Sequence, residues 1–367
     1  MNPRERLLAT LRGKRADRAP LILEGFHHAV PPEDMDPGRK EISDRITGHL
    51  HFSYVCRSFV NRYFVTPPQR MRVLERRKDG ASILTTTAID TPKGPLTAIT
   101  GCNTTTDTRW TLKYPVETLE DIEKLRAVPW ELPGDLREPD LSSLPDSFSG
   151  RGVVRTGVSS PFVCVAGAMP YELFLELCVT ESNLIRELTQ QCLDRILDVL
   201  AVILAPRTVE YAWMGGCEWL TPPMASPALY EDLVQRFEQP IIERIHAAGA
   251  ISHIHCHGNV RSTLESVIRR GADFFEPVEP PPDGDIGFAA AKAVAGGRIT
   301  LGGNIEARIL ENEDAAIVED AVRRAFEGGK FRMVLQTTAG PLSRMTPRMV
   351  ENYHRMIDVW EELSPMN

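Results

Sequence analysis

The sequence predicts a (β/α)8 TIM barrel of the α/β class with an N-terminal hairpin-containing elaboration. From residue 152 onward, short apolar runs alternate with amphipathic stretches of helical length, which is typical of parallel strands joined by crossover helices. Eight strands can be proposed, the number that closes such a barrel. The length of 367 residues suits an α/β barrel that folds as one domain. A doubly wound open sheet is the alternative, but no glycine-rich phosphate loop follows any proposed strand.

Each proposed strand is a short run of residues that favour β structure. The strands span residues 20–25, 54–60, 152–158, 209–214, 250–257, 272–276, 298–301 and 333–337. The stretches between the later strands predict helices over residues 227–248, 260–270, 290–295 and 313–326. Ser226 is a suitable N-cap for the first of these helices, and Gly249 and Gly271 follow the first and second as stop signals.

Residues 28–150 interrupt the strand–helix alternation. Apolar residues alternate with threonine over residues 83–100, around the turn Thr91-Pro92-Lys93-Gly94, which predicts an antiparallel hairpin. Residues 119–125 read as a helix and residues 131–149 as a connection. We therefore expect one barrel domain over residues 1–367, with residues 28–150 as an elaboration on it.

Composition narrows the possible functions. The net charge of −8 disfavours a nucleic-acid partner, because an acidic surface repels phosphate groups. No apolar run approaches the ~20 residues that cross a membrane, and no apolar signal core follows the charged N-terminus. The seven cysteines include no CxxC pair, which fits reduced thiols in a reducing compartment. We expect a cytoplasmic protein.

The stretch ISHIHCHGNV carries three histidines at every second position. On a strand, His253, His255 and His257 would share one face, while Cys256 would point to the other. Facing inward, the imidazoles would lie at the carboxyl-terminal mouth, where barrel active sites form. His255 and His257 would lie roughly 7 Å apart and could bind one metal ion, with His253 deeper as a catalytic or substrate-orienting group. Hydrogen bonding to substrate without metal, and a structural role, are the alternatives.

Other polar side chains follow the proposed strands. In FFEPVEPPPDGD, Glu279 is the first choice and Glu276 the second for completing a metal site or acting as general acid or base. The alternative is a solvated acidic loop. The remaining candidates are Glu218 and Asn304 as catalytic residues and His27, Glu306 and Thr337 as substrate-binding residues, with His28 and Thr338 at lower rank and turn or packing roles as the alternatives. Cys217 could bind zinc as a thiolate, and the alternative is a small buried apolar residue.

Four segments resemble the uroporphyrinogen decarboxylase superfamily: PRERLLATLRGKRADRAPL, the strand end IHCHGN, LGGNIEARIL, and TAGPLSRMTPRMVENYHRMI. The resemblance implies a (β/α)8 barrel, often in a homodimer. It also implies one of two activities: metal-free decarboxylation of a porphyrinogen, or zinc-dependent methyl transfer to or from a corrinoid or the thiol of coenzyme M.

The sequence lacks motifs that are characteristic of each of the two kinds of enzyme. The decarboxylases have an arginine-containing segment after the first strand, and here that segment is LILEGFHHAV. The methyltransferases have a His-x-Cys pair and a late cysteine. His255 matches the histidine, but His257 replaces the cysteine, and TTAGPL lacks the late one. A set of His255, His257 and Glu279 can still bind a divalent ion, with zinc the first choice.

These observations lead to one main functional hypothesis. The chain would be a metal-dependent methyltransferase or demethylase that moves a methyl group between a small substrate and a corrinoid or thiol acceptor. The corrinoid (cobalamin) would be carried by the chain or by a partner corrinoid protein. The alternatives are a metal-free carboxy-lyase, in which histidines protonate a carbanion, and a non-catalytic protein that binds a tetrapyrrole or corrinoid.

Overall fold

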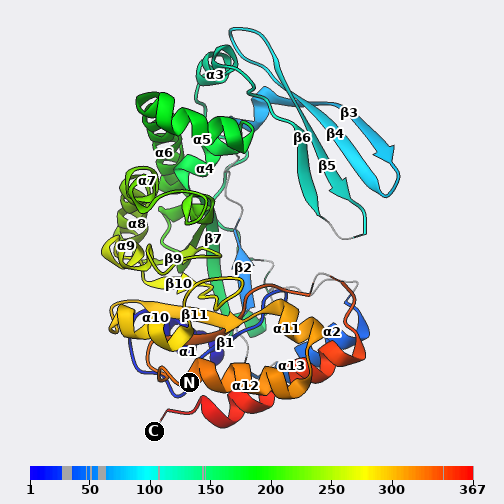
Figure 1. The fold of residues 1–367 in the computed structure, drawn as a ribbon, viewed down its shortest axis with the longest axis vertical. Coiled ribbons are helices and arrows are strands. Elements are labelled where there is room, and N and C mark those ends of the chain that lie inside the picture. The colour runs from blue at the N-terminus through cyan, green and yellow to red at the C-terminus, as the bar shows by residue number, and fades with distance from the viewer. Residues whose placement is uncertain are drawn as a thin grey trace.

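The computed structural model describes residues 1–26, 35–46, 48–49, 52–56, 63–105, 108–142, 144, 146–341 and 343–366. Within them, eight parallel strands form one curled sheet (Figure 1). The strands are β1 (Leu21–Ile22), β2 (Phe52–Val55), β7 (Gly152–Ser159), β8 (Tyr211–Gly215), β9 (Ile251–His255), β10 (Phe274–Glu276), β11 (Thr300–Ile305) and β12 (Met333–Thr337).

The strand order confirms the predicted fold class. From β2 the sheet continues through β7, β8, β9, β10, β11 and β12, and β12 pairs with β1. Every described pairing in this sheet is parallel. A doubly wound sheet would reverse direction at a switch point, and this sheet follows the chain in one direction, as a (β/α)8 barrel does.

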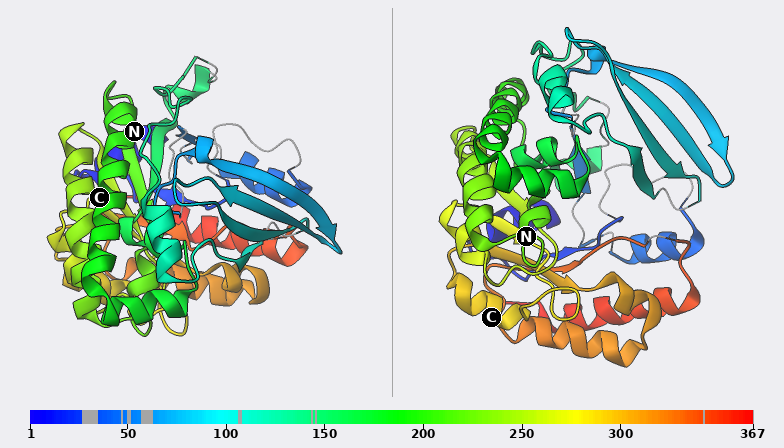
Figure 2. Two further views of the ribbon diagram at one scale, coloured as in Figure 1. Left: turned by 90° about the horizontal axis from the view of Figure 1, so that it is seen from above. Right: turned by 45° about the horizontal axis from the view of Figure 1, so that its top comes forward.

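Helices cover the outer side of the sheet (Figure 2). Those that follow β7 to β12 are α4 (Pro161–Ala166), α5 (Tyr171–Thr180), α6 (Ser182–Leu204), α7 (Pro227–Tyr230), α8 (Arg236–Ala247), α9 (Leu264–Arg269), α10 (Phe288–Ala295), α11 (Ala307–Asn312), α12 (Ala315–Phe326) and α13 (Pro347–Leu363). In the described part of the chain, no helix is both long and apolar enough to cross a membrane.

Several predicted elements have other bounds in the structure, such as the strand expected over residues 54–60, which is Phe52–Val55, and two of the differences lie beside the histidines. The helix expected over residues 227–248 is divided into α7, a π-helical turn (Glu231–Gln235) and α8. Pro240 inside α8 lacks the N–H that a regular helix requires, and the wider turn precedes it. The strand expected over residues 250–257 ends at His255, so His257 lies in the loop beyond it.

An antiparallel sheet is inserted between β2 and β7 and projects from the barrel (Figure 1). It contains β3 (Met71–Asp79), β4 (Ser82–Ile89), β5 (Leu96–Asn103) and β6 (Arg109–Lys113), and α3 (Leu119–Arg126) follows it. The predicted hairpin is confirmed as β4 and β5, paired from Ile89 with Leu96 onward. Gly94 in the turn has a φ of 107°, which favours glycine.

The bottom of the barrel interior is apolar. Helix α1 (Pro3–Leu11) packs there, and its leucines form a cluster with inward-facing side chains of the strands. The strand residues in this cluster are Ile22, Val153, Tyr211, Ile251, Phe274 and Val334. Because side chains alternate along a strand, the inward positions farther along the same strands include Trp213 and six polar residues, 24, 155, 253, 255, 276 and 336.

Candidate functional site

His253 and His255 lie on the inward face of β9 and share one carboxylate from the neighbouring strand. The register places Glu276 of β10 beside His255. Nε2 of His253 and Nδ1 of His255 lie 2.7 and 2.8 Å from Oε1 of Glu276. An ionised carboxylate only accepts hydrogen bonds, so both ring nitrogens donate. The prediction that these imidazoles face into the barrel is confirmed by this contact.

The three histidines form a gradient from the interior to the mouth. The exposed fraction of the side chain rises from 5% in His253 to 21% in His255 and 40% in His257. The ring of His253 packs on Phe274, with centroids 4.4 Å apart, and that of His255 on Trp213 at 5.1 Å. Exposure therefore identifies His255 and His257 as the pair that a ligand at the mouth can reach.

His257 has its own carboxylate partner. Its Nδ1 lies 3.0 Å from Oε1 of Glu279, while Oε2 of Glu279 accepts a hydrogen bond from the backbone N–H of Gly258 at 2.8 Å. The rings of His255 and His257 are 4.7 Å apart and nearly perpendicular, at 82°. Both side chains thus hold Nδ1 against a glutamate, and Nε2 is the nitrogen left for another ligand.

Polar side chains from other strands form hydrogen bonds and electrostatic interactions with Glu276. Its Oε2 accepts a hydrogen bond from Nε2 of Gln336 at 3.0 Å, and the same nitrogen lies 3.1 Å from Oε1 of Glu24. Arg155 of β7 interacts electrostatically with Glu24 and Glu276 and with Tyr211. Buried charges require such compensation, so these residues form one network across the barrel interior.

The network changes the pKa values of its members. Burial alone would lower the pKa of His255, but the charge and hydrogen bond of Glu276 raise it to about 9. Burial opposes ionisation of Glu276, yet the two imidazoles hold its pKa below the usual range. Burial lowers the pKa of His253 and outweighs Glu276 there. The pair Glu276–His255 is therefore ionised, and His253 is neutral.

A pocket of about 530 Å³ at the mouth brings together three of the predicted residues. Glu218, His257 and Glu279 line it with Thr221 and Met224. Glu218 follows β8 in a 3-10 turn (Cys217–Leu220), and its Oε2 accepts a hydrogen bond from the N–H of Gly216 at 3.1 Å. This pocket is the space that a small substrate would enter.

Asn304 and Glu306 lie apart from the histidines, in a second pocket of about 570 Å³ beside α10 and α12. Arg308 contacts Glu306 at 2.9 Å and Asp283 at 2.6 Å. Burial, followed by a hydrogen bond to Asp283, raises the pKa of Glu306 to about 7. These two predicted residues therefore line a different pocket from that of Glu218 and His257, and the ion pair of Arg308 with Asp283 lies between the two pockets.

The two threonine hydroxyl groups at the end of β12 accept hydrogen bonds from backbone N–H groups. Oγ1 of Thr337 accepts a hydrogen bond from the N–H of Glu24 at 2.9 Å, and Oγ1 of Thr338 accepts one from Ala307 at 3.2 Å. Because Gln336 points into the barrel, its neighbour Thr337 points away from the interior. His27 and His28 lie outside the described residues.

The sequence reasoning missed Glu24, Arg155 and Gln336 and ranked Glu276 below Glu279. A signal was present: each missed residue is a polar side chain within or just after an apolar strand, at an inward position of the period-two pattern. The sequence alone does not reveal which of the two faces points inward.

The predicted ligands His255, His257 and Glu279 do not converge as a set of three: among the described residues, Cys217, Glu218 and Cys256 are the group whose ligand atoms all lie within 4.8 Å of one another. The two imidazoles do have the carboxylate partners of a metal site. Histidines that bind a metal through one ring nitrogen usually donate the other N–H to a carboxylate or a carbonyl. His255 and His257 both have that arrangement, with Glu276 and Glu279 as the carboxylates. In this geometry Glu279 orients His257, whereas a role as third ligand requires it to exchange this hydrogen bond for the ion.

Comparison with known proteins gives a family and a fold. The uroporphyrinogen decarboxylase (URO-D) family matches residues 106–362. A solved methyltransferase from Methanosarcina mazei is 14% identical over 99% of each chain, with a TM-score of 0.60. A B12-independent methionine synthase from a Shewanella species, bound to selenomethionine, is 10% identical over 94% of this chain and 95% of that chain, with a TM-score of 0.40. No curated protein sequence matches the chain.

Proposed function

The chain belongs to the uroporphyrinogen decarboxylase family, and from this premise we propose that it is a metal-dependent methyltransferase acting on a small substrate. The observation that carries the proposal is the pair of adjacent imidazoles, His255 and His257, each with Nδ1 held by a carboxylate. Decarboxylation alone does not require two imidazoles prepared for one ion. A preassembled pair is what a metal site of the carboxylate–histidine type requires.

In this proposal Nε2 of His255 and Nε2 of His257 would hold the ion, with zinc the first choice, and the imidazolium of His255 would release its Nε2 proton to solvent as the ion binds. When bound, the ion supplies Lewis acidity toward a methoxy oxygen or a methyl-accepting thiol. Glu276 and Glu279 fix the ring orientations through Nδ1 and strengthen the imidazoles as donors. The charge that Glu276 carries also compensates part of the charge of the ion in the buried interior.

The residues around the pair bind and orient the substrate. The substrate occupies the mouth pocket between Glu218 and His257. The carboxylate of Glu218, held by the N–H of Gly216, accepts a hydrogen bond from the substrate. Neutral His253 lies beneath and fixes Glu276 rather than contacting the substrate. The methyl carrier is a corrinoid, bound by this chain or by a partner corrinoid protein, and the enzyme works in the cytoplasm as a homodimer.

Methyl exchange with purified components tests the proposal. The enzyme is incubated with a methylated corrinoid protein and a panel of methoxy and thiol compounds, and transfer is followed by the visible absorption of the corrinoid. We expect transfer that a chelator abolishes and that His255→Ala and His257→Ala reduce by at least ~100-fold. Transfer that is unaffected by both the chelator and these variants would contradict a metal role, and no transfer with any donor would contradict the reaction.

A metal-free carboxy-lyase is the second candidate, because the site also offers a proton and a cation. His255 is an imidazolium at neutral pH, since its pKa is about 9, and can protonate a carbanion. Arg155 in the interior can hold a substrate carboxylate. Release of carbon dioxide that requires His255 but persists with chelator would favour this reaction over methyl transfer.

A further inference from the structure

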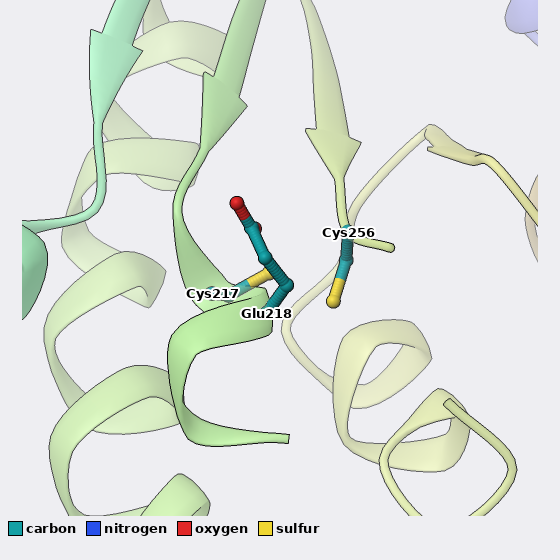
Figure 3. Close-up of side chains that lie close together, drawn as sticks. All are labelled: Cys217, Glu218 and Cys256. Carbon is teal, nitrogen blue, oxygen red and sulfur yellow. The ribbon is translucent and has the colours of Figure 1, made fainter. Parts of the chain in front are cut away.

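Two buried thiols converge on the helix-facing side of the histidine strand. Cys217 begins the 3-10 turn after β8, and Cys256 follows β9 directly. Figure 3 shows both with Glu218 at the ends of these neighbouring strands. The exposed fractions of the two cysteines are 1% and 0%. Each of the three residues offers a ligand atom, and these atoms all lie within 4.8 Å of one another.

The thiols are held by the backbone of the histidine strand. Sγ of Cys217 lies 3.6 Å from the carbonyl oxygen of His255, and Sγ of Cys256 lies 3.8 Å from that of His257. Because Cys256 stands between the two histidines, its side chain points away from their imidazoles. The thiol pair is therefore a separate group from the imidazole pair, on the other side of the same segment.

Backbone geometry at Gly216 sets the direction of Cys217. Gly216 has a φ of 112°, and a β-carbon there would lie 2.8 Å from a methyl group of Val163. Only glycine is tolerated at such a position without strain. The turn that follows directs Cys217 toward Cys256 and leaves Glu218 half-buried at the edge of the mouth pocket.

Charged groups are buried next to the thiols. Arg270 of the segment after α9 forms an ion pair with Glu238 of α8 and donates a hydrogen bond to the hydroxyl of Tyr230 at 2.7 Å. Arg270 is also within electrostatic range of Cys217 and Cys256. The hydrogen bond between the two thiols and burial nevertheless raise the pKa of Cys256 well above its usual value, so a bound ion would have to displace the thiol proton.

We propose that Cys217, Cys256 and Glu218 form a second metal site, which takes a soft or borderline divalent ion such as Zn²⁺ or Cd²⁺. Two thiolates and a carboxylate are ligands that such ions prefer, and water from the mouth pocket supplies the fourth position. Binding replaces the two S–H protons, which pass to solvent, by two metal–sulfur bonds. The ion enters past Glu218, which lines the pocket. The site is separate from the imidazole pair, but it shares Glu218 with the substrate pocket of the proposed function, so an ion bound there would compete with the substrate for this carboxylate.

Cadmium titration tests this site by a signal that the imidazoles do not give. Thiolate-to-cadmium charge transfer absorbs in the ultraviolet, so reduced, metal-free protein is titrated with Cd²⁺ alone. We expect the band to saturate at one equivalent and to disappear in Cys217→Ser and in Cys256→Ser. Glu218→Gln should keep the band but weaken the affinity by roughly 10–100-fold. The His255→Ala/His257→Ala double variant should keep the band at full height.

Two further measurements keep the test decisive if a serine variant fails to fold. Cys102 on β5, a half-buried thiol that is not part of the three-residue group, serves as the control, and Cys102→Ser should leave the band unchanged. In the wild-type protein, Cd²⁺ should protect Cys217 and Cys256 from alkylation by iodoacetamide, read by peptide mass spectrometry. Absence of the band in the wild type, or a band with equal alkylation of both cysteines with and without Cd²⁺, would overturn the proposal.

Discussion

Oε1 of Glu276 lies 2.8 Å from Nδ1 of His255, across two neighbouring parallel strands. The strand register places the two residues side by side, and the resulting contact raises the pKa of the imidazole. It also leaves Nε2 as the ring nitrogen that can face the mouth. The chemistry proposed at the mouth depends on this contact, so most of the predictions below change it or its counterpart at His257.

Glu276→Gln should weaken both the fold and the metal site. The amide keeps the shape of the side chain but removes the charge, so His255 loses the group that raises its pKa. We expect the free energy of unfolding to fall by about 1–3 kcal/mol, the usual effect of leaving a buried hydrogen-bonding group poorly satisfied. Urea unfolding and a histidine NMR titration measure the two effects; an unchanged pKa for His255 would contradict the assignment.

Stability of the metal-free protein should fall as the pH rises above neutrality. The pKa of His255 is raised from 6.5 to about 9 in the folded state. Folding therefore retains a proton that the unfolded chain releases. The stabilisation is complete below about pH 6.5 and is lost as the pH rises through about 9. Urea midpoints between these values should decline in the wild type, and His255→Gln should reduce the decline.

Glu279→Gln should lower metal affinity with little effect on folding. Its carboxylate is buried at the mouth, where it fixes His257 and accepts a hydrogen bond from the N–H of Gly258, and the amide of glutamine keeps one oxygen for that N–H. Loss of such a supporting carboxylate typically costs 10–100-fold in affinity. Calorimetric titration with Zn²⁺ measures the effect, and Glu351→Gln on the exposed face of α13 is the matched control. Equal affinities in the two variants would rule out a role for Glu279 in orienting His257.

Gly302→Ala should be destabilising because the barrel interior has no space for a methyl group. A β-carbon at Gly302 would lie 2.7 Å from Cζ of Phe274 and 2.8 Å from Cβ of Glu276. Overpacking of this kind costs typically 1–3 kcal/mol. Gly134→Ala, where no atom lies within 4 Å of the added carbon, should leave the thermal unfolding temperature unchanged. Equal unfolding temperatures in both variants would contradict the packing around Glu276.

Much of the barrel can be predicted from sequence because strand and helix periods are local properties. The alternation of polar residues with apolar ones places His253 and His255 on one face, and the Thr-Pro-Lys-Gly turn predicts the β4–β5 hairpin. The alternation shows which side chains share one face of a strand, but not whether that face points into the barrel or toward the helices. Thr337 was expected to bind substrate, yet its neighbour Gln336 is the residue that points inward.

The partners within the site could not be predicted in the same way. Glu276 meets His255 because β9 and β10 pair in one particular register, which depends on packing along the whole strands. Cys217 and Cys256 converge because two separate strands end at the same level and Gly216 directs the turn. Such contacts join residues far apart in the chain, and no local pattern in the sequence specifies them.

Zinc K-edge X-ray absorption on the zinc-loaded Cys217→Ser/Cys256→Ser protein examines the imidazole pair without interference from the thiols. If His255 and His257 bind one ion, the spectrum shows two histidine nitrogens at about 2.0–2.1 Å, and one of them is lost in His257→Ala. A spectrum with no histidine ligand, or one that His257→Ala leaves unchanged, would contradict the shared metal site.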